Sequence, residues 1–416
     1  MLASAIITAM GFLDAVFARA LASRNYRLYF AGQLVSLAGT WMQQIAMIWL
    51  AWRLSNSAAV LGMVGFASQI PILLIGPIAG VLTDRYDRRR ILLATQFAAL
   101  LQALALAALA WRGEATPGWL IGLAFVLGTI NAVDLPTRQA FSAQLVERRE
   151  DLPNAIALNS LLMNTARFVG PALAGFAVAA FGEAWCFVIN AASYLAVILA
   201  LLAMRLGPQR RSSEPAWQAF REGVAYAWGH ATIRHRLLAV AALSFLLTPY
   251  AVMMPLYANA IYGGDARTYG LLIGSAGAGA LFAGLYLASR QGTERLPRRV
   301  ADAMLLGAAG LMLFAFNTVL AVGFLIVMTI GFAVIAFVAG SNTLVQLEVD
   351  DAYRGRVMGI FSMAFLGIAP LGSFMVGQLA QRVGVQPVLF GCGLLAMAAG
   401  LALRPSLMRR KAEVAA

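Results

Sequence analysis

Long apolar segments follow one another along almost the whole chain, and they constrain its fold more than any other feature. A transmembrane helix needs about 20 consecutive apolar residues, and each segment is close to that length. The chain is 61% hydrophobic and only 12% charged, about half the charge of a soluble domain. We therefore predict an all-α membrane protein with twelve transmembrane helices. The predicted spans are residues 28–53, 59–83, 90–111, 118–142, 153–180, 183–204, 236–262, 267–289, 299–317, 319–346, 355–381 and 384–404.

The basic residues lie almost entirely in the connections between alternate spans. If both termini are cytoplasmic, 26 of the 31 lysine and arginine residues fall on the cytoplasmic face. Arg53, Arg112, Arg267 and Arg382 fall on the opposite face, and Arg167 alone lies within the membrane. Cytoplasmic loops of membrane proteins carry such an excess of positive charge. The distribution predicts a multi-pass protein of a bacterial-type inner (cytoplasmic) membrane with both termini in the cytoplasm.

One long polar stretch, residues 205–235, divides the chain into two halves. Residues 28–204 and 236–404 each contain six spans, so both halves enter the membrane in the same sense and form parallel pseudo-repeats. We expect the stretch between them to be a cytoplasmic linker with an interfacial helix. Residues 405–416 form a cytoplasmic tail. Residues 1–27 are either an amphipathic helix on the cytoplasmic surface or a disordered tail.

The connection between the second and third spans is short and rich in arginine. Asp84 ends the apolar run, where a carboxylate is costly unless a cation or a helix N-terminus neutralises it. The connection resembles the loop motif between helices 2 and 3 of the major facilitator superfamily, with Asp87 where that motif has glycine. The resemblance extends over nearly the whole chain and implies a transporter that works by alternating access. The residues that carry it are Gly80, Asp84, Arg85, Arg88 and Arg89.

The fifth span contains Gly170, Pro171 and Gly175. This run resembles the Gly-Pro-x-x-Gly-Gly motif of drug:proton exporters in the same superfamily, with Ala174 replacing one closing glycine. The resemblance implies a kinked, closely packed helix and favours export. The alternative is a glycine-proline kink that serves packing alone.

The eleventh span opens with Arg354 and Arg356. The resemblance places this end against the connection between the second and third spans. Asp84 would then lie at a helix N-terminus and latch the two halves together in the outward-facing state. With the pattern around Asn25, these segments are similar to the secretion and efflux branch that includes enterobactin-exporter-like proteins.

Arg167 is the most unusual single residue. An arginine near the middle of the membrane costs roughly 2.5–3.5 kcal/mol on insertion scales, so it should face a cavity and have a partner. Asp134 lies on the preceding span. At ~1.5 Å per residue, its depth in the membrane differs from that of Arg167 by only ~7–8 Å. We predict that the two form a coupling pair linked to alternating access. Two alternatives stay open: a static pair, or Asp134 bound to Arg138 one turn away.

Several spans carry polar or aromatic residues that would be costly in lipid and should face the bundle interior. Tyrosine, tryptophan and methionine beside polar groups suit a large amphipathic ligand. Interhelical hydrogen bonds and core packing are the alternative for any one of them. The substrate-pathway candidates are Gln33, Trp41, Gln44, Gln69, Asn131, Asn164, Tyr250, Met254, Tyr257, Asn342 and Gln346.

The sequence argues against other classes of protein. Cys186 and Cys392 lie in apolar segments, and the two histidines lie in one polar stretch, so no catalytic triad, metal site or cofactor site is expected. The net charge is +13, but the basic residues lie in the loops between apolar segments, which argues against a nucleic-acid-binding protein. We predict a monomeric, non-enzymatic, proton-linked exporter of a small amphipathic molecule such as a siderophore or drug. The alternatives are an importer or lysolipid flippase, or a sensor or scaffold without transport.

Overall fold

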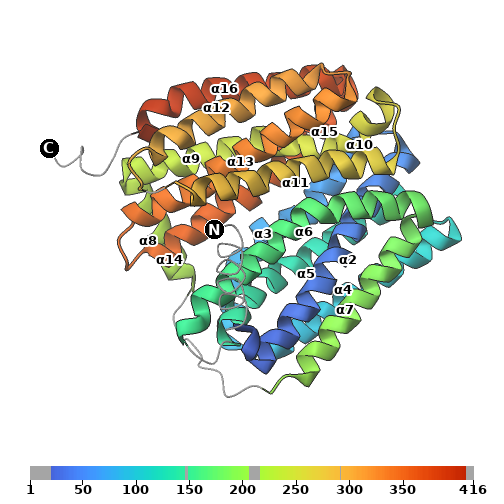
Figure 1. Cartoon of the computed structure of the whole chain (residues 1–416), viewed down its shortest axis with the longest axis horizontal. Coiled ribbons are helices and arrows are strands. Elements are labelled where there is room, and N and C mark those ends of the chain that lie inside the picture. The colour runs from blue at the N-terminus through green and yellow to red at the C-terminus, as the bar shows by residue number, and fades with distance from the viewer. Residues whose placement is uncertain (1–19, 146–148, 206–215, 291, 409–416) are drawn as a thin grey trace, which may run out of the picture.

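The computed structural model describes residues 20–145, 149–205, 216–290 and 292–408. These residues form long helices and, within the described ranges, no strand. The helices gather in two bundles, one from each half of the chain, which lie side by side (Figure 1). The structure therefore has the helical architecture that the sequence predicts.

The N-terminal half contains six long helices joined by short connections. Asp87 and Thr116 cap two of them, because their side chains accept hydrogen bonds from Arg90 N (2.9 Å) and Trp119 N (3.4 Å). Pro117 follows the second cap at the first helical position, where its missing N–H costs nothing. The helices are α2 (Arg24–Ser55), α3 (Ala58–Arg85), α4 (Arg88–Arg112), α5 (Pro117–Gln144), α6 (Leu152–Phe181) and α7 (Glu183–Ala203).

The C-terminal half repeats this plan, with two interrupted spans. Pro249 and Pro255 lack the N–H that a continuing α-helix needs, and the seventh span accordingly contains 3₁₀ and π turns. A π turn also precedes Pro370 in the eleventh span. The elements are α9 (Ala231–Leu246), η2 (Thr248–Met253), α10 (Met254–Leu256), η3 (Tyr257–Ile261), α11 (Ala266–Ala288), α12 (Leu296–Ala315), α13 (Leu320–Glu348), α14 (Arg354–Ser362), η4 (Met363–Gly367), α15 (Ala369–Val383) and α16 (Val385–Met408).

Helix α8 (Ala216–Gly229) lies within residues 205–235, between the two halves, and leads into α9 with only His230 between them; the cytoplasmic, interfacial position of this linker stays a prediction. Helix α8 lies beside α14 at one end of the molecule, while α10 lies at the other (Figure 1). We call these the α8 end and the far end. Successive long helices run in alternate directions, so α2 reaches the far end at Ser55 and α3 starts back from there.

Ten segments among the described residues are long and apolar enough to cross a membrane. The chain is therefore a multi-pass membrane protein. Helices α6 and α12 occupy the positions of the other two predicted spans, so the count of twelve stays a prediction.

Three predicted boundaries differ from the observed helices by four residues or more. α2 begins at Arg24 rather than at residue 28, α9 begins at Ala231 rather than at residue 236, and α16 continues to Met408. In each case the helix continues through polar residues at the bundle end, because backbone hydrogen bonding does not stop where hydropathy falls. The predicted surface helix lies mostly in residues 1–19, outside the described residues.

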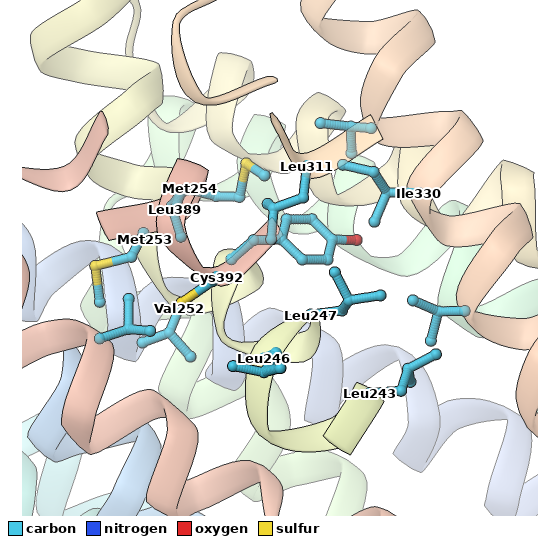
Figure 2. Close-up of a cluster of buried hydrophobic side chains, with 14 of the residues drawn as sticks. Leu243, Leu246, Leu247, Val252, Met253, Met254, Leu311, Ile330, Leu389 and Cys392 are labelled. Atoms are coloured by element: carbon cyan, nitrogen blue, oxygen red, sulfur yellow. The ribbon is translucent and has the colours of Figure 1, made fainter. Parts of the chain in front are cut away.

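The core of the C-terminal half is apolar and continuous. Leu243 and Leu247 of α9, Leu311 of α12, Ile330 of α13 and Leu389 of α16 converge on one cluster (Figure 2). Each of these five side chains is fully buried. The cluster packs the spans of this half together.

Candidate substrate site and gates

At the far end, the two halves meet through pairs of glycines. A Cβ placed on Gly62 of α3 would lie 2.7 Å from the Cα of Gly377 on α15, and one on Gly175 of α6 would lie 2.9 Å from the Cα of Gly270 on α11. Such distances leave no room for a side chain, so the backbones touch directly. Small residues allow this close approach between membrane helices. The two crossings close the far end of the interface.

Polar and aromatic side chains reinforce this closure. Trp52 Nε1 donates a hydrogen bond to Asn259 Oδ1 (3.3 Å), and Ser57 Oγ donates to Gln381 Oε1 (2.9 Å). The Trp49 ring also stacks on Tyr269, with 6.2 Å between ring centroids. All of these contacts join one half to the other.

A cavity of about 270 Å³ lies between the halves. It receives residues from α2, α3 and α6 of the N-terminal half and from the seventh, eighth, tenth and eleventh predicted spans of the other half. The glycine crossings lie on its far-end side and close access from that end. The lining residues are Trp41, Gln44, Ile45, Ile48, Gln69, Arg167, Thr248, Tyr250, Ala251, Val252, Tyr269, Ile273, Ala276, Gly277, Ala280, Gly331, Val334, Ile335, Phe365, Leu366, Ala369 and Ser373.

Arg167 projects into this cavity from the middle of α6. Its side chain is exposed although its helix is packed against the other half. A Cβ on Gly277 would lie 2.3 Å from the Arg167 carbonyl oxygen, so α11 contacts the backbone at this residue. One turn further along α6, Gly170 leaves the space that Trp41 fills, because a Cβ there would lie 2.7 Å from its indole ring. The prediction that Arg167 faces a cavity agrees with this geometry.

Asp134 does not pair with Arg167 in this structure. It forms an ion pair with Arg138, one turn along α5, which is the alternative that the sequence left open. Thr95 Oγ1 (2.8 Å) and Gln96 Nε2 (2.9 Å) of α4 also donate to its carboxylate. The carboxylate is 1% exposed and has its donors within its own half, so the predicted pairing across α5 and α6 is corrected.

The other pathway candidates divide into three groups. Trp41, Gln44, Gln69 and Tyr250 line the cavity. Gln33 is buried and accepts a hydrogen bond from Arg138 (3.0 Å), so it belongs to the network around Asp134. The side chain of Asn164 lies outside those that the structure describes.

The remaining five candidates lie away from the cavity. Met254 and Tyr257 are fully buried in the C-terminal half, where Met254 joins the cluster in Figure 2 and the Tyr257 hydroxyl donates to the Ala315 carbonyl (2.9 Å). Asn342 accepts a hydrogen bond from Gln346 (2.6 Å) on the same helix, and Asn131 is half-buried on α5. Hydropathy does not reveal which face of a helix meets the cavity, so these placements needed the structure.

The arginines between α3 and α4 bind helix carbonyls of their own half. Arg88 donates to the carbonyls of Thr83 and Ala140 (both 3.4 Å), and Arg89 donates to that of Leu202 (2.9 Å). These carbonyls lie near the C-terminal ends of α3, α5 and α7, where cations are favourable. Arg85 is exposed. The surroundings of Gly80 and of the Asp84 side chain are outside those described, so the predicted latch stays a prediction.

The two arginines at the start of α14 have other partners. Arg354 pairs with Asp351, and Arg356 pairs with Glu222 of α8. Tyr226 of α8 stacks on Tyr353, with 4.3 Å between ring centroids. The linker helix is thus docked on the start of the eleventh predicted span.

These features define a class of membrane protein: two helical bundles around a central cavity that is closed at one end. A solved nucleoside transporter, NupG, has the same fold, with a TM-score of 0.70 at 15% identity over 93% of this chain and 100% of that one. The model of the transmembrane secretion effector family matches residues 17–415. The chain belongs to this family of major facilitator transporters.

Characterised relatives cover most of the chain. The staphyloferrin A transporter of Staphylococcus aureus is 25% identical over 366 residues, 86% of this chain and 90% of that protein. The multidrug efflux pump Tap of Mycobacterium tuberculosis is 26% identical over 393 residues, 88% of this chain and 90% of that protein. The predicted superfamily and fold are therefore confirmed.

The sequence did not single out the far-end glycines Gly62, Gly270 and Gly377, or Glu222 on the linker helix. Gly270 is the first of three glycines that end at Gly277, a stripe that could have indicated close packing. A partner for a glycine cannot be read from sequence, because packing pairs residues that lie in different halves.

Proposed function

We propose that this protein exports a small amphipathic molecule, siderophore-like or drug-like, across the bacterial cytoplasmic membrane by alternating access. The observation that carries the proposal is the central cavity, which is closed at the far end by the glycine crossings; we infer that it opens toward the α8 end. The arginine-rich connections lie at the α8 end, which we assign to the cytoplasm. The described conformation would then be inward-facing and ready to load substrate from the cell.

Transport requires the two halves to rock against each other. The glycine pairs Gly62–Gly377 and Gly175–Gly270 place smooth backbone at the two far-end crossings, so opening this end requires few side-chain contacts to break, such as Trp52–Asn259 and Trp49–Tyr269. The Gly170–Pro171 segment lies on the same helix as one of these crossings. Two relatives support the proposal: the efflux pump supports the direction, and the siderophore transporter and the multidrug pump support the substrate type.

We further propose that Asp134 couples export to the proton gradient. It is a buried carboxylate inside a predicted span, and it holds Arg138, which in turn donates to Gln33 of α2. Protonation would remove the charge that holds Arg138 and loosen the link between α2 and α5. Coupling would therefore act through this network in the N-terminal half, apart from Arg167 in the cavity.

Efflux from cells and uptake into inverted vesicles test this function, with and without a proton uncoupler, over a panel of siderophores and dyes. We expect the uncoupler to abolish uphill transport. Asp134→Asn should lower uphill transport about tenfold or more, in the range typical for the loss of a proton-transfer group, while downhill movement of substrate continues. Asp302→Asn, at a pair that is half-exposed on the surface, is the matched control. Uncoupler-sensitive uphill transport by Asp134→Asn at the wild-type rate would refute the coupling role.

A further inference from the structure

The central cavity contains a positive charge with no described acid beside it. Arg167 is the one charged residue among the described residues that line the cavity. In the described part of the chain, Arg167 forms no ion pair or hydrogen bond with another side chain. An ionisable residue within the membrane is costly and marks a functional site by default. The charge is therefore a feature of the cavity that needs a chemical reason.

The described acids in or beside the nearby spans have partners outside the cavity. Asp134 is the acid that lies well inside a described span, and it is held by Arg138, Thr95 and Gln96. Glu183 and Glu348 lie at helix ends and pair with Arg53 and Arg236. No described acid lines the cavity. Among the described residues, then, none supplies a counter-charge for Arg167, and a molecule that enters the cavity can supply it.

The rest of the wall is aromatic and apolar. Trp41 of α2 lines the cavity and packs against Gly170, one turn from Arg167 on α6. Tyr250, Tyr269 and Phe365 line the cavity from the opposite half. Isoleucine, valine and leucine side chains complete the wall, with Gln44 and Gln69 as neutral polar groups. A ligand that fits this cavity has one charged end and an apolar, ring-containing body.

We propose that this cavity binds an anionic amphipathic molecule with an aromatic body, and that the Arg167 guanidinium pairs directly with its carboxylate or sulfonate. This inference rests on the proposed transport function and specifies its substrate class. A guanidinium offers two parallel N–H donors that match the two oxygens of such a group. A cationic compound is disfavoured by the same residue, since no acid among the described lining residues offsets the repulsion.

Two fluorescent ligands with the same skeleton separate charge from hydrophobicity. 8-Anilinonaphthalene-1-sulfonate carries a permanent negative charge, and N-phenyl-1-naphthylamine lacks the sulfonate. Their dissociation constants would be measured on the purified full chain in lipid nanodiscs, with the signal of empty nanodiscs subtracted. Arg167→Gln should weaken binding of the sulfonate roughly ten- to hundred-fold and change binding of the neutral compound less than about twofold.

Two further variants keep the test sharp. Arg167→Lys retains the charge but not the paired donors, so its affinity for the sulfonate should fall between those of the wild type and Arg167→Gln. Arg112→Gln removes an exposed arginine at the end of α4, outside the cavity, and should bind both ligands as the wild type does. Equal weakening of both ligands in Arg167→Gln, or no weakening of the sulfonate, would overturn the proposal.

Transport assays on the same variants distinguish failure of this inference from failure of the proposed function. If the sulfonate binds in an Arg167-dependent manner but neither it nor any compound of the panel moves in vesicles, the transport proposal fails and the anion site stands. If vesicles transport compounds of the panel while binding of the sulfonate ignores Arg167, export stands and the anion site is wrong.

Discussion

The two ends of the molecule are held together in different ways. At the far end, the halves meet through backbone contacts between glycines, with Gly62 against Gly377 and Gly175 against Gly270. Toward the α8 end, charged side chains bind helices within one half: Asp134–Arg138 in the N-terminal half and Arg236–Glu348 in the C-terminal half. The charges therefore stabilise each half internally, whereas the closest contacts between the halves are glycine backbones, with a few polar and aromatic side chains beside them.

This difference suits a protein whose halves move as units. A buried ion pair is expensive to break, because each partner left alone keeps its desolvation cost, so a pair within one half keeps that half rigid. Backbone contacts between glycines involve no interlocked side chains, so the two helices can separate and meet again at these positions. Substitutions at the two ends should consequently have different effects: loss of stability for the charges, and a shift of conformation for the glycines.

The largest effect is expected at the Arg236–Glu348 pair. Arg236 is fully buried, and the carboxylate of Glu348 is its ion-pair partner at the end of α13. Glu348→Gln should lower the free energy of unfolding by about 3–5 kcal/mol, measured by thermal unfolding in detergent. The double variant Arg236→Met with Glu348→Leu should recover most of this loss, because neither charge is then buried alone.

Arg298→Gln is the control for this prediction. Its pair with Asp302 is exposed on the surface, and such pairs contribute about 0–1 kcal/mol. If Glu348→Gln and Arg298→Gln lowered the unfolding temperature equally, the charges at the α8 end would not stabilise the halves as argued here.

A smaller effect, and one of a different kind, is expected at the far end. A Cβ on Gly270 would lie 2.5 Å from the Pro171 carbonyl and 2.8 Å from the Gly175 Cα. Gly270→Val should therefore cost about 1–3 kcal/mol, and only in the conformation in which the far end is closed. That cost shifts the population roughly ten- to hundred-fold toward conformations open at the far end, while the unfolding temperature changes little.

The shift can be measured by labelling a cysteine in the cavity. Gln44→Cys lies on the cavity wall, and the native Cys186 and Cys392 are buried. A membrane-impermeant maleimide applied from the far side should label it at least about tenfold faster in the Gly270→Val background. Gly122→Val, at a glycine with open space around it, should leave the rate unchanged. An unchanged rate in Gly270→Val would show that this crossing does not close the far end.

Much of the fold could be predicted because the information is local. Hydropathy locates spans, since each must supply its own apolar surface to lipid. The resemblance of the arginine-rich connection near Asp84 and of the Gly170–Gly175 segment gave the superfamily. The position of Arg167 on a cavity could also be predicted from that residue alone, because a charged side chain inside the membrane is costly unless it faces a cavity or a partner.

The partners of these residues could not be predicted in the same way. Asp134 had two arginines at a suitable depth, and the choice of Arg138 depends on the orientation of α5 toward α4, which supplies Thr95 and Gln96. Met254 resembled a cavity residue by composition but faces the core (Figure 2). Asp87 stands where the superfamily motif has glycine, and it holds the turn by capping α4, a solution visible only in the backbone.

The smallest effect is expected where the linker helix docks on α14. The Glu222 and Arg356 side chains are partly exposed, at 42% and 29%, so this pair resembles a surface salt bridge worth about 0.2–1 kcal/mol. Glu222→Gln should raise hydrogen exchange in α8 no more than about fivefold, and high salt should have a similar effect on the wild type. Tyr226→Ala, which removes the stack on Tyr353, should raise exchange further, whereas Arg221→Gln, on an exposed residue of the same helix, should not. If Glu222→Gln instead lowered the unfolding temperature as much as Glu348→Gln, the linker would belong to the rigid C-terminal half. The linker helix would then not be a separate element that can release α14 when the halves move. The α8 end would contain a second strongly stabilising contact beside the buried ion pairs.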